Sequence, residues 1–242
     1  MEVALILLIG HFLGDFTLQP TLWATKKYKE YKFLVFHIAT YALILGLVLF
    51  LSEARISAWR AWLLIVIAHY FIDRFKIWYS NKKHRSGLNQ LISFCADQML
   101  HLLSIGVAYL CFDLSANTTN LFVRICSQYP VEIMARYLLL FILLMSPASV
   151  FIKKLTAYIS ADERESEYIP GKPSPGSLIG KLERLIIAMF VIFDEVSGIG
   201  IVLAAKSFAR YKQFEKQEFT EKFLVGTLAS MAIAIFLTFI LV

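Results

Sequence analysis

The sequence predicts an all-α integral membrane protein, a polytopic bundle of about seven transmembrane segments. Of its 242 residues, 58% are hydrophobic, and the mean hydropathy of +0.65 is well above that of an ordinary soluble domain. The apolar residues gather in runs close to the roughly 20 residues that cross a bilayer as a helix. The formal charge is +6, and the basic residues lie in short loops between these runs, as expected of cytoplasmic loops beside anionic lipid headgroups. We therefore expect a lipid bilayer as partner and no nucleic acid.

Four apolar runs make up the front half of the chain, residues 1–112. They cover residues 2–18, 33–51, 58–78 and 91–112. The first run has no basic region ahead of it and no small-residue cleavage site after it, so we do not interpret it as a cleaved signal peptide. Basic loops follow the first and third runs, which predicts that these loops are cytoplasmic and that the N-terminus lies outside.

The rest of the chain is less regular. A weak amphipathic piece at 121–129 precedes a fifth span at 131–152, a polar loop at 153–177, and a back half, residues 178–242, with spans at 185–205 and 223–242. Both flanks of the sixth span look cytoplasmic, so we predict that it is re-entrant and broken near Ser197, Gly198 and Gly200. We expect a single domain over residues 1–242, and the sequence leaves a homo-oligomer open.

Histidine and aspartate side chains recur in the front spans at helical spacing. His11 and Asp15, His69 and Asp73, and Asp97 and His101 are each four residues apart, which makes the two members of a pair neighbours on one helix face. The predicted topology places all of them, with His37, at similar depth near the cytoplasmic side. A charged aspartate near the bilayer centre costs about 2.5 to 3.5 kcal/mol unless it is paired or coordinated. These residues therefore indicate a buried polar site.

Imidazole and carboxylate groups together are the usual ligands of zinc, and they also suit manganese or iron. We therefore predict a divalent metal centre, with zinc as the first choice. Its predicted ligands are His11, Asp15, His37, His69, Asp73, Asp97 and His101. Two other interpretations stay open for the same residues: a structural hydrogen-bond cluster between spans, and a relay for protons or ions.

Charged residues also border the sixth span. Glu195 or Asp194 would supply a further ligand or a general base, while an internal salt-bridge network is the alternative for this set. Basic side chains from both halves would bind a phosphate group, and the predicted set is Lys76, Arg184, Lys206 and Arg210.

Several motifs together resemble one known family. They are His11-Phe-Leu-Gly-Asp15-Phe-Thr-Leu-Gln19, His37, His69-x-x-x-Asp73-x-x-Lys76, Asp97-Gln98-x-x-His101, Gly180-Lys-Leu-Glu-Arg184, Ala204-Ala-Lys-Ser-x-x-Arg210 and Gly226-Thr-Leu-x-Ser230. The chain resembles the bacterial membrane proteins grouped as domain of unknown function 3307, over nearly its whole length. This resemblance implies a multi-pass protein of the bacterial inner membrane, but no established reaction. In ligand type alone, the pairs are similar to metal-dependent inner-membrane hydrolases associated with the DNA-damage regulon.

The leading functional hypothesis is a metal-dependent hydrolase acting on a lipid-linked or amphiphilic substrate, with or without a phosphate group. A metal-activated water would be the nucleophile, and the catalytic carboxylates would come from Asp97, Asp73 and Glu195. Two other classes stay open: a transporter for a metal ion or proton that uses the same cluster, and a non-catalytic membrane scaffold.

Overall fold

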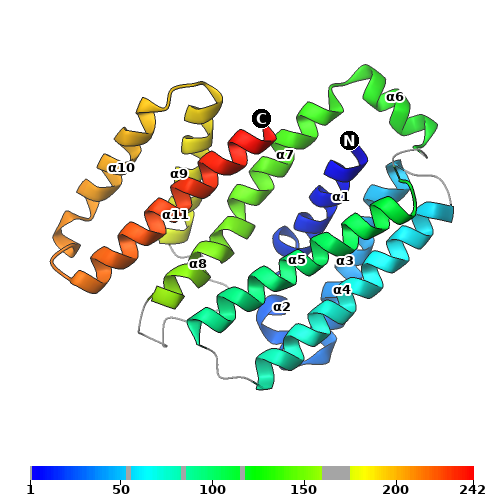
Figure 1. Ribbon diagram of the computed structural model, residues 1–242, viewed down its shortest axis with the longest axis horizontal. Coiled ribbons are helices and arrows are strands. Elements are labelled where there is room, and N and C mark those ends of the chain that lie inside the picture. The colour runs from blue at the N-terminus through cyan, green and yellow to red at the C-terminus, as the bar shows by residue number, and fades with distance from the viewer. Residues whose placement is uncertain (1, 53–55, 83–85, 115–117, 160–174) are drawn as a thin grey trace. The chain divides into compact units, whose positions relative to one another are not determined.

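The structure is a computed structural model that describes residues 2–52, 56–82, 86–114, 118–159 and 175–242 (Figure 1). These residues form helices joined by short turns, which confirms the all-α prediction. The chain divides into two compact units. Unit 1 comprises Met1–Arg85 and Ile92–Ile142, and unit 2 comprises Ser86–Leu91 and Leu143–Val242. Unit 1 therefore extends beyond the predicted front half, which ends at residue 112.

Unit 1 contains the helices that correspond to the first four predicted spans. Its elements are α1 (Glu2–Phe12), the π-helical turn η1 (Leu13–Thr17), α2 (Thr21–Lys26), α3 (Tyr31–Ser52), α4 (Ile56–Lys82), most of α5 (Gly87–Cys111), α6 (Asn120–Gln128) and most of α7 (Val131–Met145). Helix α3 is central among the first four: α1, η1, α2 and α4 all pack against it.

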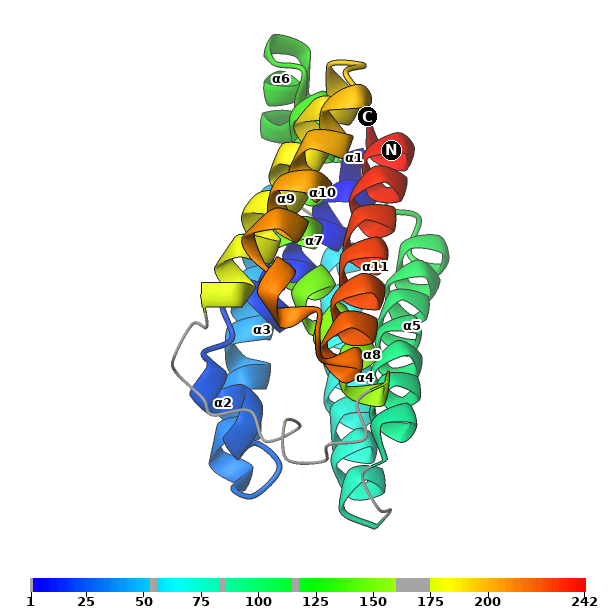
Figure 2. The same cartoon turned by 90° about the vertical axis from the view of Figure 1, so that its left-hand side faces the viewer.

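Unit 2 contains the end of α7, then α8 (Pro147–Ile159), α9 (Pro175–Ile192), α10 (Ser197–Ala209), η3 (Tyr211–Gln213) and α11 (Gln217–Leu241). Helix α9 packs against α8, α10 and α11, and α11 also packs against α8 (Figure 2). The predicted fifth span is split into α7 and α8, because Pro147 lacks the N–H that would continue the first helix. Helix α8 covers the start of the predicted loop 153–177, and residues 160–174 of that loop lie outside the described residues.

The predicted sixth span is not one helix. Helix α9 ends at Ile192 and α10 begins at Ser197, so the break lies slightly before the predicted one. Asp194, in the turn, has a φ of 58°, in the left-handed region. A Cβ on Gly198 would lie 2.5 Å from the ring of Phe190, so a larger residue there would clash with α9.

Within the described residues, four helical runs are long and apolar enough to cross a membrane: α3, α5, α7 with α8, and α11. The predicted count of seven is not confirmed. Helix α4 has the length, but Arg60, Asp73, Arg74 and Lys76 interrupt its apolar character, and α1 and α10 are short. Large apolar side chains on the outer faces of the long helices are exposed, as lipid-facing residues would be; they include Leu43, Leu103 and Phe239.

Candidate metal centre

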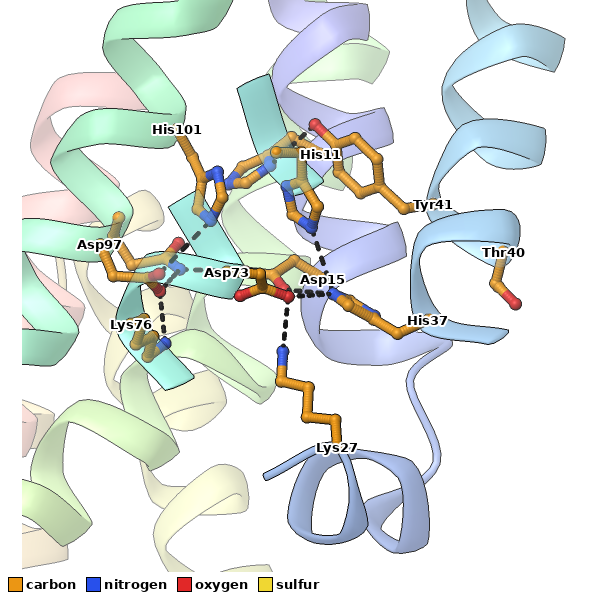
Figure 3. A network of polar contacts seen from close by, with 12 residues as sticks. His11, Asp15, Lys27, His37, Thr40, Tyr41, Asp73, Lys76, Asp97 and His101 are labelled. Carbon is orange, nitrogen blue, oxygen red and sulfur yellow. Dashed lines mark hydrogen bonds and ion pairs between the residues drawn. The ribbon is translucent and has the colours of Figure 1, made fainter. Parts of the chain in front are cut away.

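The structure brings together all seven of the His and Asp side chains singled out in the sequence. Figure 3 labels all of them except His69. Each is no more than 8% exposed. They come from four segments of unit 1: His11 and Asp15 from α1 and η1, His37 from α3, His69 and Asp73 from α4, and Asp97 and His101 from α5.

The π-helical turn positions Asp15. The backbone N–H of Leu18 donates to the carbonyl of Leu13 at 2.8 Å, five residues back, which widens the last turn of the first span. Gly14 lies in this turn against Tyr41, and a Cβ on Gly14 would lie 2.9 Å from the Tyr41 ring. The helix ends at Thr17, so Gln19 does not continue the helix face of His11 and Asp15.

Asp15, His37 and His69 form a first group that could hold a metal ion, with one ligand atom of each within 4.8 Å of the others. The Nε2 atoms of His37 and His69 are 3.1 Å apart, and Asp15 Oδ1 is 3.4 Å from the same His37 nitrogen. Two nitrogens bound tetrahedrally to one zinc, each at about 2.0 to 2.1 Å, lie about 3.3 Å apart. These two spacings therefore fit a metal site.

A second group comprises Asp15, Asp97 and His101, again with ligand atoms within 4.8 Å of one another. Asp97 Oδ1 lies 3.5 Å from His101 Nε2. The side-chain amide of Gln98 donates from Nε2 to Asp15 Oδ2 at 2.9 Å and to Asp97 Oδ2 at 3.1 Å, so it holds the two carboxylates together.

Several buried atoms of the cluster have no hydrogen-bond partner within the described part of the chain. They are His11 Nε2, His37 Nδ1, His69 Nδ1, Asp97 Oδ1, Gln98 Oε1 and both ring nitrogens of His101. Leaving a buried polar group unpaired costs about 1 to 3 kcal/mol. A bound cation would satisfy the atoms that face the two groups, so the donor set fits a divalent metal.

Two lysines neutralise carboxylates of the cluster. Lys27, at the end of α2, is 7% exposed and donates to Asp73 at 2.9 Å, while Lys76 on α4 donates to Asp97. Burial by itself would lower the pKa of Lys27, but the carboxylates of Asp73 and Asp15 outweigh burial and raise this pKa above the usual lysine value. The sequence singled out Lys76 but not Lys27, because nothing distinguishes Lys27 from its neighbours Lys26, Lys29 and Lys32.

Tyr41 is a further member that the sequence reasoning missed. Its ring stacks on His69 with centroids 3.8 Å apart, and His69 in turn stacks on His101 at 4.2 Å. Its hydroxyl lies 3.2 Å from His11 Nδ1. If His11 Nδ1–H donates to this hydroxyl, the lone pair of Nε2 is left for a metal. The signal that would have found Tyr41 is its position one helical turn after His37 on α3.

The cluster is closed at one end by the apolar core of unit 1. On α1 and α4 the core residues come before the cluster residues in the sequence, and on α3 and α5 they come after them. Because consecutive helices run in opposite directions, all of these core residues lie at the same end of the cluster. They include Val3 and Leu7, Leu45 and Leu49, Ala61 and Ile65, and Ile105 and Ala108. Lys27 and Lys76 lie at the opposite end, where α1 leads into α2 and where α4 approaches its C-terminus. We call the polar end of the cluster, marked by these two lysines, its mouth, and the apolar end its floor.

The predicted site residues of the back half belong to unit 2. Arg184 is buried and donates to the Leu144 carbonyl, Ser149 Oγ and Ser230 Oγ, so its guanidinium is engaged by protein acceptors. Lys206 pairs with Glu183, in agreement with the salt-bridge alternative for this set. Glu195 is exposed in the turn after α9, and Arg210 is half-buried at the end of α10. Their roles in catalysis and phosphate binding stay predictions.

The family model of DUF3307, described as a protein of unknown function, matches residues 3–127, just over half of the chain. The chain belongs to the DUF3307 family. All seven His and Asp residues of the cluster, and both lysines at its mouth, lie inside the matched DUF3307 segment. No curated protein and no solved structure matches the chain. This match confirms the family that the motifs predicted. The description of the DUF3307 family names no reaction.

Proposed function

We propose that this protein is a membrane-embedded, metal-dependent hydrolase that acts on the phosphate ester of an amphiphilic substrate. The observation that carries the proposal is the first metal group, in which two imidazole nitrogens and a carboxylate oxygen converge at 3.1 and 3.4 Å in a buried site. A divalent metal in such a site supplies an activated water at neutral pH and neutralises charge on the substrate.

The protein residues have distinct roles in this proposal. Asp15, His37 and His69 would hold the metal, whose charge would attract the anionic headgroup, while Lys27 and Lys76 at the mouth balance the carboxylates of Asp73 and Asp97. Hydrolysis adds one water across the ester: the water oxygen bonds to phosphorus, and the bond from phosphorus to the alcohol oxygen breaks. Asp73 or Asp97 accepts one proton of the water and returns it to the departing alcohol.

The closed floor of the cluster favours an enzyme over a transporter. A transit path needs polar groups on both sides of the binding site, whereas Leu45, Leu49, Ile65 and Ile105 fill the end beyond the histidines. The exposed apolar faces of α3 and α5 suit a substrate whose tails stay in lipid while its headgroup enters at the lysines.

The placement in the membrane is part of the proposal. Basic residues around the mouth favour a cytoplasmic position for it, with the N-terminus on the outside of a bacterial inner membrane and α9 with α10 as a re-entrant hairpin. The resulting seven segments are tested by labelling single introduced cysteines from each side of intact cells. Labelling of a cysteine at Lys29 from the outside would contradict this orientation.

The test of function combines metal content with turnover. We expect detergent-purified protein to contain at least one equivalent of zinc, manganese or iron by plasma mass spectrometry, and to release phosphate from phosphatidic acid in mixed micelles. His37→Ala should lose metal and lower phosphate release at least about 100-fold, while Glu215→Gln, an exposed control in unit 2, should match the wild type. Wild-type protein without metal after reconstitution, or unchanged turnover in His37→Ala, would refute the proposal.

A further inference from the structure

We infer that the cluster is a two-metal centre in which Asp15 bridges two divalent ions. This inference rests on the proposed function and deepens it, because it assigns a second metal site to the same cluster. The first ion would take Asp15, His37 and His69, and the second Asp15, Asp97 and His101.

The ligand atoms form two groups that share one residue, and they do not form a single group around one point. The two oxygens of Asp15 face different groups. Its Oδ1 lies 3.4 Å from His37 Nε2, whereas its Oδ2 accepts the amide of Gln98, which also bonds Asp97. A carboxylate with one oxygen toward each site is the arrangement that bridges two ions about 3.5 to 4 Å apart.

The second group contains potential ligand atoms that have no hydrogen-bond partner among the described residues. His101 is 1% exposed, and neither of its ring nitrogens has a hydrogen-bond partner among the described residues. Asp97 Oδ1, 3.5 Å from His101 Nε2, is also without one. An ion between these two atoms would satisfy both at once. His11 Nε2 is a third unsatisfied donor, on a ring whose centroid is 5.5 Å from that of His101.

Gln98 supports a cation at the same place. Its Nε2 donates to both carboxylates of the second group, and its buried Oε1 has no partner within the described residues. Because the nitrogen and oxygen of an amide exchange places on a half-turn, the same side chain can present Oε1 to a cation that lies between Asp15 and Asp97. Gln98 therefore holds the carboxylates together without the ion and can coordinate it when bound.

The charge of the cluster points to the substrate. Three carboxylates face two ammonium groups, so with neutral imidazoles the cluster carries one net negative charge. Two bound divalent ions would change the net charge to three positive. A bound phosphate ester dianion would then lower it to one positive. Paired ions of this kind stabilise both the attacking and the departing oxygen of a displacement at phosphorus. Since Asp97 becomes a ligand, Asp73 is left as the carboxylate that carries the proton.

The inference is tested by the number of ions in each variant and by their magnetic coupling. The protein is loaded with manganese, freed of excess ion, and examined by plasma mass spectrometry and electron paramagnetic resonance. We expect two equivalents and an exchange-coupled spectrum for the wild type. His101→Ala and the isosteric Asp97→Asn should each retain one equivalent with the six-line spectrum of an isolated ion, while Asp15→Asn should lose both. Glu215→Gln should match the wild type.

The alternative outcomes separate this inference from the proposed function. One equivalent in the wild type that is lost in His37→Ala but kept in His101→Ala and Asp97→Asn would overturn the second site and leave the hydrolase standing. No bound manganese in the wild type would overturn both. Circular dichroism and gel filtration in detergent identify any variant that fails to fold, and Asp97→Asn then decides in place of His101→Ala because it preserves side-chain volume.

Discussion

The Nε2 atoms of His37 and His69 face each other at 3.1 Å across the interface of α3 and α4. Two neutral imidazoles cannot both direct lone pairs at this distance without repulsion, so a proton or a cation must lie between them. The scaffold holds this contact tightly, because Tyr41 stacks on His69 and packs with the apolar core. Such preorganisation lowers the cost of closing a metal site.

Metal should stabilise the wild type through this contact. At a free metal concentration 100-fold above the dissociation constant, binding adds about 2.7 kcal/mol to the free energy of unfolding. We expect zinc or manganese to raise the melting temperature of the wild type, and His37→Ala and His69→Ala to lose most of this shift. Tryptophan fluorescence during thermal unfolding in detergent measures it. An equal shift in both variants would place the metal elsewhere.

Tyr41→Phe should weaken metal binding without unfolding unit 1. The substitution keeps the stack on His69 but removes the hydroxyl that contacts His11 Nδ1. Loss of a hydrogen bond that orients a ligand typically costs 10- to 100-fold in metal affinity. Competition with a chromophoric chelator measures the affinity. An unchanged affinity would show that His11 is not a ligand.

Gly14→Ala should destabilise unit 1. The added methyl would lie 2.9 Å from the Tyr41 ring, which cannot retreat because it is itself buried against His69. Overpacking of this kind costs about 1 to 3 kcal/mol. Gly106→Ala on α5 is the matched control, since a Cβ there meets no atom within 4 Å. It should be neutral or stabilising by up to about 1 kcal/mol.

Lys27→Met should destabilise the metal-free protein by about 3 to 5 kcal/mol, because it leaves the buried Asp73 carboxylate without its cation. The double variant Lys27→Met/Asp73→Asn should recover much of this loss. The pKa of Lys27 is raised in the folded protein, so its contribution is fully present below the usual lysine pKa of 10.5. It is lost only as the pH rises through the raised value. A cycle measured at neutral pH in which the two changes simply add would contradict the pairing.

Arg184→Lys should destabilise unit 2 and leave metal content unchanged. Lysine keeps the charge but cannot reach the Leu144 carbonyl, Ser149 and Ser230 together. The Leu144 carbonyl lies at the end of α7, just before Pro147 interrupts the helix. Without Arg184 this buried acceptor would have no hydrogen-bond donor. We expect a fall of about 1 to 3 kcal/mol in the free energy of unfolding. A fall in metal content instead would give Arg184 a role in the site.

The parts of the site that the sequence predicts are those with local signals. The spacing of four residues between His69 and Asp73, or between Asp97 and His101, follows directly from helical periodicity. Lys27 has no such signal, because its burial depends on how the loop after η1 returns to α3. The π-helical turn is equally hard to predict, because one extra residue in a turn does not change the hydropathy pattern.

The break in the sixth span was predicted from its glycines, whereas the break at Pro147 in the fifth span and the C-terminal end of the long helix α4 were not. Pro147 divides the fifth span, and the turn before Ser197 divides the sixth. Helix α4 continues to Lys82, four residues beyond the predicted end at residue 78, because its last turns tolerate charged side chains outside an apolar run. Hydropathy indicates which residues suit the lipid interior, but it does not indicate where the backbone hydrogen bonds of a helix end.

In the proposed membrane placement, Leu45, Leu49 and Ile65 fill the space beyond the histidines, so the cluster would be accessible from only one leaflet of the bilayer. A substrate that enters at Lys27 and Lys76 would have to leave by the same route. Turnover would return the products to the side of the membrane that supplied the substrate, so it would not move material across the bilayer. A lipid synthesised in the opposite leaflet would be out of reach until it is flipped, so supply across the bilayer, rather than chemistry, would limit the rate in a cell.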